Sequence, residues 1–246
     1  MRFMKFIAAF IVIFMVSCAS VPKDPMAMSP EEIYAMAEQE MTKKNYAEAR
    51  EHFKTLKIRD VEKKYYAIAQ IRTGDAFFAE ESYPEAAAEY DAFLSIHTYH
   101  DEAPYSRYRL ALCYQKQIDS VDRSYENILN ARREFARLMK DFPRNPYRES
   151  AMAGIARCDN QIASYEDYVG SFYLKKGSYK AAIGRYETLL AAYPGAGVET
   201  DVLLKLGQAY KEIGESGKAR DILSGLIARY PSSRQAEQAR DILGSP

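Results

Sequence analysis

Residues 199–231, ETDVLLKLGQAYKEIGESGKARDILSGLIARYP, decide the fold. Apolar and small residues recur every three or four positions in each half, which predicts two amphipathic helices joined by a turn at Gly214. Small residues allow the two helices to approach, larger ones fill the space between them, and proline ends the second helix. The positions that carry this pattern are Gly207, Tyr210, Ala219, Leu223, Leu226 and Pro231.

The same spacing recurs upstream, and it is the spacing of tetratricopeptide repeats. The repeat before the last has Gly170, Tyr173, Ala182, Tyr186, Leu189 and Pro194 in register. An earlier one has Gly74, Phe77, Ala86, Tyr90 and Phe93, and the first has Ala37, Ala49, Phe53 and Leu56. Glu40 occupies the aromatic position of the first repeat. A generic helical bundle would show the helical period without this recurrence at fixed spacing.

The third repeat is irregular. Tyr114 and Ala131 are separated by eight residues more than the pattern requires, which predicts a long turn containing Asp119–Ser124. Residues 150–176 then read as one helix that runs into the fourth repeat.

Both ends of the repeat region carry recognisable signals. Ser29-Pro30-Glu31-Glu32 is a helix-capping box, and Ser233–Leu243 predicts a last helix that covers the final repeat. We therefore predict an all-α, right-handed superhelix of five tetratricopeptide-like helix pairs with a C-terminal capping helix, over residues 30–245.

The N-terminus indicates secretion. Arg2 and Lys5 precede an apolar run, Phe6–Val16, that is too short to span a bilayer permanently. The run ends at Met15-Val16-Ser17-Cys18, which resembles the lipobox of bacterial lipoproteins. We expect a signal peptide at 1–17, lipid on Cys18 and a flexible tether at 18–29. The alternative is an ordinary signal peptide with an unrelated Cys. Ala19 after the Cys, by resemblance to enterobacterial sorting, favours the periplasmic face of the outer membrane.

Composition excludes some classes of function. The chain has 34 basic and 34 acidic residues, whereas proteins that bind nucleic acid electrostatically are markedly basic. It contains no phosphate-binding glycine loop and no hydrolase motif, so we expect a protein that is not an enzyme and needs no cofactor beyond the lipid on Cys18. His97 and His100 have metal-ligand spacing, but no further ligands complete a site, and we expect no bound metal.

Two further cysteines, Cys113 and Cys158, raise the question of a disulfide, because the periplasm is oxidising. Both align at the same position of successive repeats. Equivalent positions on packed helices lie about 8–10 Å apart, which is too far for a disulfide, so we predict buried free thiols.

Several segments resemble the BamD lipoproteins (also called YfiO or ComL), which take part in inserting β-barrel proteins into the outer membrane. They are Pro30–Tyr34, Asn45–Ala49, Val121–Ser124, Ala131–Phe135, Phe142–Tyr147, Ile162–Glu166, Tyr173–Gly177 and Ala181–Glu187. The resemblance runs from Pro30 to about Leu243, and the charged segment Lys57–Tyr65 departs from it.

The resemblance implies a scaffold whose C-terminal half, 141–245, docks BamA and smaller lipoproteins of the assembly complex. Its N-terminal half, 30–140, would receive unfolded outer-membrane β-barrel proteins. The alternatives are another periplasmic tetratricopeptide lipoprotein, for pilus assembly or for cell-division or envelope coordination, and an enzyme or metal-binding module.

Two sets of site residues follow. Arg185 precedes the core residue Tyr186, so its guanidinium is a candidate for binding a partner's carboxylate, or for pairing with Glu187 or a neighbouring helix. In tetratricopeptide arrays, particular positions of the first helix of each repeat face the concave side. In the first three repeats, the residues at these positions predict a substrate groove, where aromatic rings contact an extended segment and Asp75 or Gln115 hydrogen-bonds to its backbone. The predicted groove residues are Tyr34, Glu38, Ile71, Asp75, Phe78, Tyr105, Tyr108 and Gln115.

Overall fold

The computed structural model describes residues 28–120 and 124–244, and these form eleven helices. The signal peptide, Cys18 and Val121–Arg123 lie outside the described residues. The helices are α1 (Pro30–Thr42), α2 (Tyr46–Arg59), α3 (Tyr66–Ala79), α4 (Tyr83–Ile96), α5 (Ala103–Lys116), α6 (Tyr125–Asp141), α7 (Arg148–Lys175), α8 (Tyr179–Ala192), α9 (Glu199–Glu212), α10 (Ser216–Arg229) and α11 (Arg234–Gly244).

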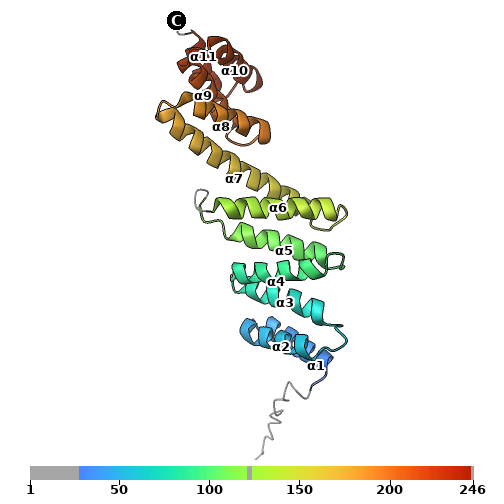
Figure 1. Cartoon of the computed structure of the whole chain (residues 1–246). Coiled ribbons are helices and arrows are strands. Elements are labelled where there is room, and N and C mark those ends of the chain that lie inside the picture. Colours follow the sequence, from blue (N-terminus) through green and yellow to red (C-terminus); the bar gives the residue numbers. More distant parts are fainter. Residues whose placement is uncertain (1–27, 121–123, 245–246) are drawn as a thin grey trace, which may run out of the picture.

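The helices stack in chain order into an elongated superhelix (Figure 1). Each helix packs mainly on its neighbours in sequence, as expected of a solenoid. Five helix pairs, α1–α2 to α9–α10, are followed by α11, which packs on α9 and α10 through the buried Ala236 and Ala239. The predicted all-α architecture with five pairs and a cap is confirmed.

Small residues on the first helix of a pair meet a large side chain from the second, as the repeat pattern predicts. A Cβ placed on Gly74 would lie 2.9 Å from Tyr90 Cε1, and one on Gly170 would lie 2.4 Å from Tyr186 Cε1. Tyr90 and Tyr186 are fully buried. The absence of a side chain at these glycines therefore sets the distance between the paired helices.

The turn within each regular pair has a common backbone geometry. In each of these four pairs, the second residue after the end of the first helix has a positive φ. These residues are Lys44, Glu81, Gly177 and Gly214. Glycine adopts this left-handed conformation without a steric penalty, whereas Lys44 and Glu81 adopt it against their intrinsic preference.

The two predicted irregularities are also present. α7 is a single helix of 28 residues, close to the predicted 150–176, and it links the third repeat to the fourth (Figure 1). The turn between α5 and α6 is longer than the equivalent turns, and Ser124 and Asp119 are joined in it by a side-chain hydrogen bond.

At the N-terminus of α1, Ser29 and Glu32 form the predicted capping box. Both described cysteines are unpaired and buried: Cys113 packs among the side chains between α3, α4 and α5, and Cys158 among those between α6 and α7. Burial raises the pKa of Cys113 to about 12 and that of Cys158 to about 11, so both remain protonated thiols at neutral pH.

Candidate functional site

The predicted groove residues lie on α1, α3 and α5, the first helices of the first three pairs. Six of them are half-buried: Tyr34, Glu38, Phe78, Tyr105, Tyr108 and Gln115. Ile71 is only 1% exposed and Asp75 only 6%. Ile71 packs in the core with Tyr90 and Leu110, so it does not line an accessible surface.

Asp75 lies at the centre of a hydrogen-bond network between repeats. Its Oδ1 accepts from the hydroxyls of Tyr90 and Tyr105, each at 2.6 Å, and its Oδ2 accepts from Arg72 at 2.8 Å. Because Asp75 is buried and both of its oxygens already accept hydrogen bonds, it is not the exposed acceptor for a peptide backbone that the sequence suggested. Its role in the structure is to hold Tyr105 and Arg72 in place.

Two arginines that sequence reasoning missed extend this network along the superhelix. Arg72 of α3 donates two hydrogen bonds to Glu38 of α1, at 2.7 and 2.6 Å. Arg109 of α5 lies 3.7 Å from Asp75 of α3 and donates to Tyr90 at 3.1 Å. In each case an arginine reaches an acidic residue on the first helix of the preceding repeat. This ladder of pairs joins α1, α3 and α5.

Burial keeps the tyrosine hydroxyls in the network protonated. The pKa of Tyr90 and the pKa of Tyr105 are both raised, chiefly by desolvation and then by the nearby Asp75 carboxylate. A neutral hydroxyl is a hydrogen-bond donor, so both tyrosines donate to Asp75 throughout the physiological range.

The half-buried aromatic rings of the groove pack against other side chains. Tyr34 stacks on Tyr65, with ring centroids 5.4 Å apart. Tyr108 stacks on Tyr147 at 4.7 Å, with an interplanar angle of 8°. The guanidinium of Arg109 lies 3.7 Å from the ring centroid of Phe78, a cation–π contact. One part of each ring thus contacts protein and the rest remains open to solvent.

Gln115 lies further along α5, and its amide nitrogen is buried without a hydrogen-bond partner among the described residues.

Arg185 lies at the other predicted site, on α8. Its side chain is 47% exposed and donates to Glu166 of α7 at 2.9 Å. The predicted alternative of an intramolecular pair is thus realised, with a neighbouring helix and not with Glu187, which accepts a hydrogen bond from Tyr210. Arg185 and Glu166 line a shallow hollow of about 420 Å³ together with Tyr173, Ala181, Gly184 and Thr188.

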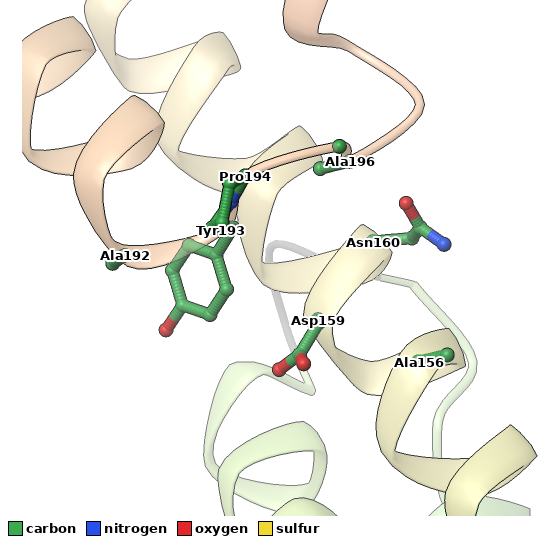
Figure 2. A pocket seen from close by; sticks show the side chains of 8 residues that line it. Ala156, Asp159, Asn160, Ala192, Tyr193, Pro194 and Ala196 are labelled. Atoms are coloured by element: carbon green, nitrogen blue, oxygen red, sulfur yellow. The ribbon is translucent and has the colours of Figure 1, made fainter.

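A second hollow, of about 310 Å³, lies between α7 and the connection from α8 to α9. Figure 2 shows Asp159 and Asn160 on α7 beside the segment from Tyr193 to Ala196. Asn160 Oδ1 accepts from the Gly197 amide at 2.8 Å, and Asp159 is paired with Arg132 of α6. The polar groups of this hollow therefore bind other parts of the chain, and we interpret the hollow as the place where α7 is fixed against α6 and the α8–α9 connection.

Comparison with known proteins identifies the family. A family model described as YfiO, outer membrane lipoprotein, matches residues 26–224. The chain belongs to the YfiO family. The resemblance to the BamD lipoproteins is confirmed by curated relatives named outer membrane protein assembly factor BamD. The one from Caulobacter vibrioides is 27% identical over 221 residues, which cover 88% of this chain and 72% of the relative.

The relative from Neisseria meningitidis serogroup B is 26% identical over 215 residues, covering 83% of this chain and 80% of the relative. Among solved structures, a tetratricopeptide-repeat protein from Bacteroides fragilis is similar with a TM-score of 0.48 and 18% identity. That alignment covers 87% of this chain and 96% of the other.

Other features of this YfiO-family chain bear on the remaining expectations. His97 and His100 both pack against Phe93, with ring centroids 5.1 and 5.4 Å away. No cluster of three or more His, Cys, Asp or Glu suited to a metal occurs in the described part of the chain. None of the helices described is long and apolar enough to cross a membrane.

Proposed function

We propose that this chain is a non-enzymatic scaffold that helps to assemble β-barrel proteins into the outer membrane. Membership of the YfiO family, over residues 26–224, is the observation that carries this proposal. The relatives are named assembly factors, and a superhelix of helix pairs provides an extended surface for binding other proteins. A lipid on Cys18 would anchor the scaffold at the periplasmic face of the outer membrane.

The N-terminal half, 30–140, is the proposed receiver of unfolded substrates. Outer-membrane β-barrel proteins generally end in a strand with alternating apolar residues and a terminal aromatic. Such a segment would lie across α1, α3 and α5, against the open parts of the rings of Tyr34, Phe78, Tyr105 and Tyr108. The network around Asp75 supports this proposal, because a surface whose side chains are already fixed loses little entropy on binding.

Tyr108→Ala tests the substrate surface. We expect the variant to bind a peptide from the C-terminus of a barrel protein about tenfold more weakly, since a binding aromatic typically contributes about one to two kcal/mol. Isothermal titration calorimetry measures this affinity. Tyr125→Ala is the matched control, because Tyr125 is also half-buried and its ring centroid lies 4.4 Å from that of Tyr165. Equal weakening by both variants would remove the support for a specific groove.

The C-terminal half, 141–245, is the proposed docking region for BamA and the smaller lipoproteins. Arg185 is the candidate contact, because its exposed guanidinium can exchange Glu166 for a partner's carboxylate. An exposed pair of this kind contributes little to the stability of the fold. Replacing it should therefore change docking without unfolding the chain.

We expect Arg185→Glu to lower the amount of BamA that co-purifies with the tagged protein by about tenfold, through loss of a charged contact. Exchanging the pair, as Glu166→Arg with Arg185→Glu, restores the internal ion pair but not the charge at position 185. The exchanged variant should remain defective if Arg185 itself contacts the partner. Recovery of BamA in the exchanged variant would assign the effect to the internal pair instead.

A further inference from the structure

The turn between α2 and α3 exposes two aliphatic side chains. Ile58, in the last turn of α2, is 73% exposed, and Val61, in the turn itself, is 89% exposed. Single exposed apolar residues are ordinary on protein surfaces. Ile58 and Val61 differ from such residues because they lie beside the N-terminal tether.

This turn has a fixed backbone. Asp60 is buried, and its Oδ2 accepts a hydrogen bond from the Tyr65 amide. Its carbonyl accepts from the Lys63 amide at 3.0 Å, and Lys63 has a φ of 56°. These bonds close the turn around Asp60, so that Val61 is held pointing outward.

The tether enters the fold at the same place. Arg59 donates to the carbonyl of Met28 at 3.3 Å, and Lys64 lies 3.4 Å from Glu31 at the start of α1. Pro30 and Glu31 line a hollow of about 310 Å³ with the turn residues. Figure 1 shows α1 and the α2–α3 connection together at one end of the superhelix.

The distance from the proposed lipid to this turn is limited. The ten residues from Ala19 to Met28 span at most about 35 Å even when fully extended. A tether of this length keeps the turn close to the bilayer that holds the lipid, which raises its effective concentration at the surface.

The charge of the turn also suits a membrane surface. Residues 57–64 contain four basic and two acidic residues. The equivalent turn of the next repeat exposes Ile96 and Tyr99, but it carries Asp101 and Glu102 and no Lys or Arg. Apolar side chains rimmed by lysine and arginine are the composition that binds anionic phospholipid interfaces.

We propose that the α2–α3 turn is a second membrane contact, in which Ile58 and Val61 enter the headgroup region and the basic residues face lipid phosphates. The proposal rests on the proposed lipid anchor at Cys18. A single lipid anchor would leave the superhelix free to rotate about it. A second contact beside the tether fixes which side of the first repeat faces the membrane.

The chain contains no tryptophan, so Val61→Trp introduces a single fluorescent reporter. The full lipidated protein is reconstituted into vesicles of phosphatidylethanolamine and phosphatidylglycerol, with or without brominated acyl chains. We expect a blue-shifted emission and at least about twofold quenching by brominated lipid. Tyr168→Trp is the control, since Tyr168 is 66% exposed on α7, well along the superhelix from the tether.

Vesicle flotation tests the lipid anchor separately from the membrane contact of the α2–α3 turn. If the parent chain floats with the vesicles and Cys18→Ala does not, the anchor at Cys18 is supported. A reporter at position 61 that is then unquenched, or quenched no more than the reporter at position 168, overturns the membrane contact alone. Shielding of the position-61 reporter only after BamA is co-reconstituted also overturns it, in favour of a protein contact. A parent chain that does not float overturns the anchor and the membrane contact together.

Discussion

Gly170→Ala is expected to lower the free energy of unfolding by about 1–3 kcal/mol, although alanine is the better helix former. An alanine Cβ at this position would lie 2.4 Å from Cε1, 2.9 Å from Cζ and 3.0 Å from Cδ1 of Tyr186. The Tyr186 ring is fully buried among the side chains of α8 and α9 and cannot move aside without disturbing them. α7 and α8 would therefore have to separate.

Gly184→Ala is the matched control on α8. Among the described atoms outside its own helix backbone, none lies within 4 Å of a Cβ built there, so the substitution only improves helix propensity. We expect it to raise the free energy of unfolding by up to about 1 kcal/mol. Urea denaturation followed by circular dichroism measures both variants. A Gly170→Ala protein as stable as the parent would show that the close approach of α7 and α8 does not depend on the glycine.

The sequence predicts these contacts within helix pairs well because they are local. Gly170 and Tyr186 belong to the same repeat, and the spacing between them recurs in the repeats at Gly74 and Gly207. The capping box at Ser29 and the long helix α7, whose apolar period is not interrupted by a helix-ending residue, are local in the same way. In each case, the residues that determine the structure lie in one short stretch of the chain.

Contacts between repeats were harder to predict, because they depend on how each repeat is rotated on the one before. The concave-face rule placed Ile71 and Asp75 in a groove, whereas the rotation between repeats buries both. Arg185 pairs with Glu166 across the α7–α8 pair and not with Glu187, and this contact depends on how the two helices of one repeat face each other. Cys18 lies outside the described residues, so its lipidation remains a prediction.

A usable signal for the network was nevertheless present. Glu38 and Asp75 occupy equivalent positions of α1 and α3, and Arg72 and Arg109 occupy equivalent positions of α3 and α5. An acid on one repeat and an arginine on the next, recurring in register, indicates a ladder of ion pairs along the superhelix. Comparing charged positions between repeats, as well as small and aromatic ones, would have found Arg72 and Arg109.

Asp75→Ala is expected to lower the free energy of unfolding by about 3 kcal/mol, because it removes one partner from a buried charged network and leaves the others unpaired. The Tyr90 hydroxyl would lose its acceptor inside the core, and the hydroxyl of Tyr105 would lose the bond that fixes its ring. Glu38→Ala removes the half-exposed end of the same ladder. Because solvent screens that pair with Arg72, we expect its loss to cost no more than about 1 kcal/mol.

Adding Tyr90→Phe separates an unsatisfied hydroxyl from a simple loss of packing. Phenylalanine fills the same space beside Gly74 and has no hydroxyl proton to leave without an acceptor, although Arg109 loses the oxygen to which it donates. In the Asp75→Ala background it should therefore recover part of the lost stability, whereas in the parent it should be destabilising because it removes a hydrogen bond to Asp75. This opposite sign in the two backgrounds is the double-mutant-cycle result expected for a coupled pair. Equal destabilisation in both would mean that Asp75 and Tyr90 act independently, and that the ladder does not hold the aromatic face in place.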